Sequence, residues 1–80
     1  MTKEEIIAKL IEDAAIVYKS DASKLAADTD ISATLGTNSL NRMGMCAMIE
    51  NHFDVVIPLA EFGTYKTFQD LADMIAEQDA

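Results

Sequence analysis

Apolar residues recur every three or four positions near the start and near the end of this sequence, and that spacing constrains the fold more than any other feature. In the first segment the repeat comprises Ile7, Leu10, Ile11, Ala14 and Tyr18. In the last it comprises Phe68, Leu71, Ala72 and Ile75. Both patterns match one face of an amphipathic helix, whereas a half-buried strand alternates at every second residue. The sequence therefore predicts an all-α fold, with a first helix over residues 3–18 whose acids Glu4, Glu12 and Asp13 lie off the apolar stripe.

Capping residues mark where these two helices begin. Thr2 followed by Glu5 fits a capping box, in which each side chain accepts a hydrogen bond from the other residue's backbone N–H. Thr67 is a suitable cap for the last helix, and Asp70 carries a negative charge at that helix's positive end.

A further helix is expected from about Asn38-Ser39-Leu40 to about His52. Thr37, Asn38 and Ser39 are all good N-caps, so the pattern leaves the exact start open. Apolar residues surround most of this helix. On one side the helical periodicity places Met45, Cys46, Ile49 and Phe53, and on the other Leu40, Met43, Gly44 and Ala47. A small protein cannot bury both sides within its own fold, so the second side is a candidate contact surface.

The remaining segments are expected to connect the helices. Residues 19–38 show no sustained periodicity and predict a long loop, with Asp21 capping one short turn over Ala22–Leu25. Val55-Val56-Ile57 has no partner strand and precedes Pro58, which indicates an extended linker. Residues 59–63 are expected to form one short helical turn.

Size and charge restrict the classes of partner. The 80 residues suffice for a single domain, expected over 1–80. There are 14 acidic and 6 basic residues, a net charge of −8, which disfavours nucleic acids and anionic membranes and favours basic protein surfaces. Cys46 is the only cysteine, and no apolar run is long enough to span a membrane. We therefore expect a monomer in the cytoplasm, with no nucleic acid bound and no membrane insertion.

Neither Cys46 nor His52 is expected to bind a metal or to take part in catalysis. No histidine stands at a helical step from Cys46, and no second soft ligand is close to His52, which we expect to be solvated near the end of its helix. No nucleophile is paired with a base anywhere in the sequence, so the chain is not expected to be an enzyme.

Ser39 stands at the start of a helix, directly after a glycine bend at Gly36. A phosphate esterified to its hydroxyl would lie beside free backbone N–H groups at the positive end of the helix dipole. Taken alone, the pattern favours a serine that merely caps the helix, because a glycine followed by serine or asparagine before a helix is common.

The residues around Ser39 resemble the acyl carrier protein family. Leu35-Gly36-Thr37-Asn38-Ser39-Leu40 resembles the family signature L-G-x-D-S-L, and residues 49–57 followed by Pro58 resemble its EEEFDxxIP segment. Asp28-Thr29-Asp30-Ile31 and Thr67-Phe68-Gln69-Asp70-Leu71 are similar to two further motifs of the family. The motifs occur in order, at the expected distances, over nearly the whole chain.

This resemblance implies a four-helix bundle with a short third helix and a long loop between helices one and two. It implies a 4′-phosphopantetheine group, transferred from coenzyme A to Ser39 by a phosphopantetheinyl transferase, with Asn38 and Leu40 as flanking signature residues. The group's thiol would carry an acyl chain as a thioester between acyl-transferring or acyl-activating enzymes of fatty-acid, lipid or polyketide-type biosynthesis. Positions that match the family's acyl pocket are Ile31, Cys46, Ile49, Ile57 and Tyr65; ordinary core packing explains these residues equally well.

Two departures from the family pattern point to a specialised carrier rather than one of bulk fatty-acid synthesis. Asn38 replaces the signature aspartate, and Glu50 is the only acid in residues 39–53. Partner docking is therefore expected to use Leu40, Met43, Ala47 and Glu50, with apolar contact more important than charge. Two alternatives stay open: a peptidyl or aminoacyl carrier, and an unmodified interaction module of the same fold.

Overall fold

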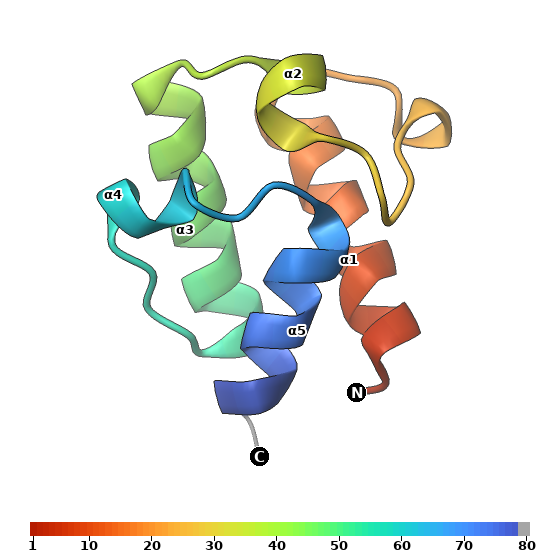
Figure 1. Cartoon of the computed structure of the whole chain (residues 1–80), viewed down its shortest axis with the longest axis vertical. Helices are drawn as coiled ribbons and strands as arrows, with labels where there is room; N and C mark the ends of the chain where they lie inside the picture. The colour runs from red at the N-terminus through yellow and green to blue at the C-terminus, as the bar shows by residue number, and fades with distance from the viewer. Residues whose placement is uncertain (79–80) are drawn as a thin grey trace.

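Three long helices and three short helical segments make up the fold of the computed structural model, which describes residues 1–78. The long helices are α1 (Lys3–Val17), α3 (Ser39–Phe53) and α5 (Phe68–Gln78); the short segments are the 3₁₀ turn η1 (Ala22–Lys24), α2 (Ile31–Leu35) and α4 (Leu59–Phe62) (Figure 1). Residues 1–78 contain no strand, and only an isolated bridge joins Asp30 to Thr67. The all-α prediction, including a short helix between the second long helix and the last, is confirmed.

The predicted caps form at both ends of the sequence. At α1, the Thr2 Oγ1 accepts a hydrogen bond from the Glu5 N–H (3.1 Å), and the Glu5 Oε1 accepts one from the Thr2 N–H (2.8 Å). The hydrogen bond from the Thr2 backbone N–H, together with the nearby Thr2 hydroxyl, favours the ionised carboxylate and so lowers the pKa of Glu5. At α5, Thr67 and Asp70 exchange the same pair of bonds, at 3.1 and 3.3 Å.

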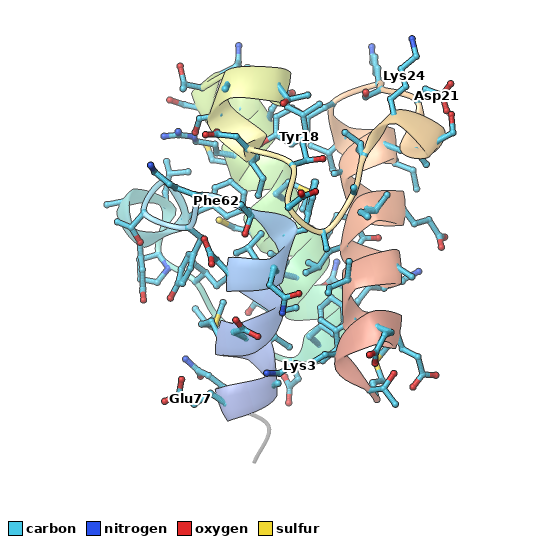
Figure 2. The ribbon with its side chains drawn as sticks, turned by 45° about the vertical axis from the view of Figure 1, so that its right-hand side comes forward. Lys3, Tyr18, Asp21, Lys24, Phe62 and Glu77 are labelled. Atoms are coloured by element: carbon cyan, nitrogen blue, oxygen red, sulfur yellow. The ribbon has the colours of Figure 1, made fainter. Side chains whose placement is uncertain are left out.

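One apolar core lies between the three long helices. α1 packs against both α3 and α5, and α4 packs against α3. The buried apolar residues are Ile6, Leu10, Ala14, Leu25, Ile31, Met45, Ile49, Val55, Ile57, Phe62, Phe68, Leu71, Ala72 and Ile75. Each large side chain among them contributes about 1.5–3 kcal/mol relative to solvent exposure. Lys3 and Glu77 lie at one end of this bundle, and Tyr18, Asp21 and Lys24 lie at the other (Figure 2).

The segment between α1 and α3 is more ordered than its sequence predicts. Asp21 caps η1 as expected, but residues 31–35 also form a helix, whose cap is Asp30 (Oδ1 to the Ala33 N–H, 3.0 Å). Two backbone bonds tie the segment to the start of α5: Ile31 N–H to Lys66 O (2.8 Å) and Gln69 N–H to Ala27 O (2.9 Å). Helical periodicity did not reveal α2 because a helix of five residues is shorter than two turns.

The placement of Asp13 by helical periodicity was wrong: this residue, predicted to lie off the buried stripe, is fully buried. His52 is exposed, as predicted, and it also contacts the Asp13 carboxyl: Nδ1 of His52 lies 2.9 Å from Oδ2 of Asp13. The His52 side chain is 32% exposed. A buried carboxyl group requires a polar partner, and here the partner is a residue 39 positions away in the sequence.

Gly44 was placed on the outer side of its helix, yet it faces α1. A Cβ atom built on Gly44 would lie 3.0 Å from Cγ1 of Val17, which is closer than ordinary van der Waals contact. The missing side chain therefore lets the end of α1 approach α3 closely, and this packing offsets the roughly 1 kcal/mol that a helical glycine costs relative to alanine.

We expect His52→Ala to destabilise the fold by about 2–3 kcal/mol, because the substitution removes a hydrogen-bond partner of the buried Asp13 carboxyl. Urea unfolding at pH 7 would measure the change. Asn51→Ala, at the exposed neighbouring position, is the matched control and should change stability by less than about 0.5 kcal/mol. Equal stabilities of the two variants would show that the pair contributes nothing.

Candidate functional site

Gly36 directs the chain from α2 into α3. It ends α2 with φ of 90°, a conformation that L-residues with a side chain rarely adopt, and its N–H donates to the Ser32 carbonyl (2.9 Å). A Cβ at this position would meet no atom within 4 Å. The requirement for glycine is therefore one of backbone conformation, as the bend predicted from the sequence implies.

Asn38, not Ser39, caps α3. The Asn38 Oδ1 accepts hydrogen bonds from the Leu40 N–H (2.9 Å) and the Asn41 N–H (3.2 Å), and Ser39 is the first residue of the helix. Ser39 is exposed, and its hydroxyl makes no hydrogen bond with residues 1–78. This geometry fixes the first residue of α3, which the sequence pattern left open, and excludes the interpretation of Ser39 as the capping residue.

The residues predicted to contact partners share one exposed face with Ser39. Leu40 is 76% exposed and Met43 54%, and Ala47 and Glu50 are also exposed. Along α3 these residues follow each other at steps of three or four, so their side chains form one stripe. The opposite side of the helix buries Met45 and Ile49, as the periodicity predicts.

Arg42 lies on α3 one turn after Ser39, and its side chain reaches both α2 and the end of α4. Its Nη2 donates a hydrogen bond to Oγ of Ser32 on α2 (3.2 Å), and its Nη1 would lie 2.9 Å from a Cβ on Gly63, which follows α4. The side chain is partly buried. No local sequence pattern predicts these contacts of Arg42, because Ser32 and Gly63 are 10 and 21 residues away in the chain.

The residues at acyl-pocket positions lie in the core or against it. Ile31, Ile49 and Ile57 are buried, while Cys46 and Tyr65 are partly buried and pack on the same cluster. Burial raises the pKa of the Cys46 thiol, so the thiol is protonated at neutral pH and is a poor nucleophile. All five residues thus have a packing role.

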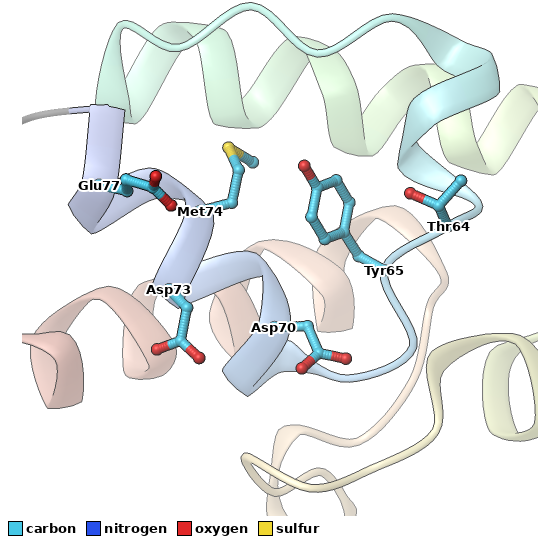
Figure 3. A pocket seen from close by; sticks show the side chains of 6 residues that line it. All are labelled: Thr64, Tyr65, Asp70, Asp73, Met74 and Glu77. Carbon is cyan, nitrogen blue, oxygen red and sulfur yellow. The ribbon is translucent and has the colours of Figure 1, made fainter.

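A surface hollow of about 350 Å³ lies between α5 and the turn that precedes it. Figure 3 shows its lining, which comprises Thr64, Tyr65, Asp70, Asp73, Met74 and Glu77. Two of its acids already have partners: Asp70 caps α5, and Asp73 pairs with Lys3 at 3.0 Å. Within the part of the chain that the structure describes, no three His, Cys, Asp or Glu side chains gather in a way that could hold a metal ion.

Comparison with protein families gives a match to the phosphopantetheine attachment site family over residues 5–75, nearly the whole chain. This chain belongs to that family. A search of curated proteins found no match. Members of the family are carrier proteins that hold covalently attached 4′-phosphopantetheine, and they interact with phosphopantetheinyl transferases and with enzymes that handle acyl groups. Carrier domains of this kind are not themselves catalytic. No helix among residues 1–78 has the length and apolar character that a membrane span requires.

The start of α3 fits a phosphate ester. The first turn contains no acidic residue, and the Ser39 N–H is not used by the Asn38 cap. Backbone N–H groups and the helix dipole both favour an anion at this end. Ser39, Asn38 and Leu40 are thus placed so that the serine hydroxyl is accessible while its neighbours stabilise the helix start.

We expect Asn38→Ala to destabilise the fold by about 1 kcal/mol, because both cap hydrogen bonds are lost. Asn38→Asp keeps these bonds and adds a negative charge at the positive end of the dipole, so it should stabilise the fold by about 0.3–1 kcal/mol. Thermal unfolding of both variants checks this. Thr37→Ala, at an exposed residue that makes no cap bond, is the control, and a loss equal to that of Asn38→Ala would contradict the assignment of the cap.

Proposed function

We propose that residues 1–80 act as a single acyl carrier domain in which Ser39 bears the 4′-phosphopantetheine group. The observation that carries the proposal is the position of Ser39: an exposed first residue of α3 with a free hydroxyl, beside a cap that a neighbouring residue supplies. The chain itself catalyses no reaction and presents a thioester-bound acyl group to separate enzymes. The attached group supplies the thiol.

Each residue at the start of α3 has a distinct role in this function. Asn38 fixes the helix start and thereby the position of the Ser39 hydroxyl. Leu40 is exposed next to that hydroxyl, where an apolar pocket of a transferase can bind it. A phosphopantetheinyl transferase is the first partner that the function requires, because the Ser39 hydroxyl makes no hydrogen bond within residues 1–78 to a side chain that could act as its general base.

The partner surface is the stripe of Leu40, Met43, Ala47 and Glu50. Its two large apolar side chains are more than half exposed, whereas Glu50 is its only acid, so desolvation of apolar area outweighs charge in docking. The net charge of −8 is concentrated on other elements and acts at long range, where it steers the chain towards basic proteins. This distribution supports a specialised carrier of fatty-acid, lipid or polyketide-type biosynthesis, which acts as a cytoplasmic monomer.

The acyl chain is proposed to insert among Ile31, Cys46, Ile49, Ile57 and Tyr65. These residues surround the interior of the bundle from four different segments, and three of them are buried aliphatic side chains. Met45, in the core beside Cys46, has a flexible side chain that adapts to irregular shapes and so favours reversible insertion.

Modification of Ser39 can be tested directly by intact mass spectrometry. Incubation with coenzyme A and a promiscuous phosphopantetheinyl transferase should add one phosphopantetheinyl group to the wild type and none to Ser39→Ala. A known carrier protein in the same reaction confirms that the transferase is active. If the wild type is unmodified, the assay is repeated with Asn38→Asp: modification then shows that the transferase requires the aspartate, and its absence leaves the unmodified interaction module as the function.

Apolar docking predicts which substitutions impair modification. Leu40→Ser and Met43→Ser should each lower kcat/KM of the transferase reaction about tenfold, equivalent to roughly 1.4 kcal/mol. Glu50→Gln should change it less than threefold, roughly 0.65 kcal/mol. The matched control is Ile16→Ser, because Ile16 is 61% exposed but lies on α1. A loss with Glu50→Gln larger than that with Leu40→Ser would show that charge governs docking.

A further inference from the structure

Arg42 is the basic residue closest in sequence to Ser39, and the helix places the two side chains near each other. Residues three apart on a helix have Cβ atoms about 5–6 Å apart. Helical side chains are directed towards the N-terminus, so the Arg42 side chain extends from its own turn towards the turn that contains Ser39. The observed guanidinium contacts Ser32 and lies beside Gly63, and an arginine side chain at this spacing is long enough to turn to a phosphate esterified to the Ser39 hydroxyl.

The Arg42 guanidinium also has donors to spare. Arginine has five N–H donors, and within residues 1–78 only one hydrogen bond of this group is formed, from Nη2 to Oγ of Ser32 at 3.2 Å. That bond is long and its acceptor is neutral. Hydrogen bonds from a guanidinium to an anionic oxygen are shorter and about twice as strong.

The electrostatic setting at the start of α3 differs from that of the chain as a whole. The net charge is −8, yet the first turn of α3 contains no acid and its capping residue is the neutral Asn38. Among residues 1–78, Arg42 has no carboxylate partner within 4.0 Å; Lys3 and Lys9 pair with Asp73 and Glu12, whereas Lys19, Lys24 and Lys66 also have none.

From these observations we infer that Arg42 is a positioning residue for the phosphodiester on Ser39. This inference rests on the proposed function. In the unmodified chain the guanidinium holds Ser32 on α2; in the modified chain it donates to a phosphate oxygen and restrains the first bond of the arm. Arg42 does not take part in the transfer reaction.

The test compares unmodified and modified forms of each variant, so that any effect of a substitution on the bundle itself cancels. Mass spectrometry first establishes that Ser39 is modified in every sample. Modification should raise the folding equilibrium constant, from urea unfolding, at least about tenfold more in the wild type than in Arg42→Gln, because a charge-assisted hydrogen bond contributes about 1.5–3 kcal/mol. Arg42→Lys, which keeps the charge but not the planar donor group, should retain part of the difference.

Two control variants separate this role from others. Ser32→Ala removes the α2 contact and leaves the guanidinium intact, so it should keep the full effect of modification. Lys24→Gln removes an exposed positive charge on η1, which lies across the bundle from the start of α3 (Figure 1), and it should also keep the effect. Phosphorus NMR adds a local readout: the phosphodiester resonance should shift in Arg42→Gln and stay unchanged in Lys24→Gln.

The outcomes are distinguishable. Failure to modify both the wild type and Asn38→Asp overturns the proposed function and this inference with it. Modified chain in which Arg42→Gln retains the full stability increase, with an unchanged phosphorus resonance, overturns the inference alone and leaves the carrier function intact. An effect of Ser32→Ala equal to that of Arg42→Gln would also overturn it, since Arg42 would then act only through α2.

Discussion

The contact between α1 and α3 fixes the orientation on which the functional site depends. Near one end of this contact, the absence of a side chain at Gly44 lets Val17 approach the backbone of α3. Further along, the buried Asp13 carboxyl binds His52. The first contact is steric and the second polar, and they lie eight residues apart on α3, about two turns. Together they prevent rotation of α3 about its axis, because a rotation would separate the Asp13–His52 pair and introduce a clash at Val17.

A fixed rotation of α3 determines what faces solvent. With Met45 and Ile49 in the core and Gly44 and His52 against α1, the stripe from Leu40 to Glu50 can only point outward. Ser39 begins the same helix and borders this stripe, so the proposed attachment point and the proposed docking surface lie on one side of the molecule. A partner that binds the stripe is thereby brought next to the arm. On the adjoining side of α3, Arg42, Cys46 and Ile49 follow Ser39 at steps of three or four residues. This row of side chains runs from the exposed Ser39 to Ile49 in the core.

Features that depend on neighbours in the sequence were predictable, and those that depend on distant residues were not. The capping box at Thr2, the cap at Thr67, the turn after Asp21 and the extended segment before Pro58 all follow from local residue types. Periodicity also gave the buried and exposed sides of α3. It failed for Asp13, because an acid is assigned to solvent unless its partner is known, and His52 is far away in the sequence. It failed for Gly44 for the same reason: only the position of Val17 explains why a side chain is excluded.

The neutral residue before Ser39 is consistent with both halves of the proposed function. The family signature has an aspartate at this position, and an aspartate would place a negative charge beside a phosphodiester. For two exposed charges about 5 Å apart in water, the repulsion is about 0.8 kcal/mol, and salt reduces it further. Asn38 avoids this repulsion and still provides both cap hydrogen bonds, since its side chain accepts them through Oδ1 as a carboxylate would. An aspartate at position 38 would also attract a basic partner at short range. A chain that docks mainly through Leu40 and Met43 depends little on that attraction, so a neutral Asn38 is compatible with an apolar docking stripe.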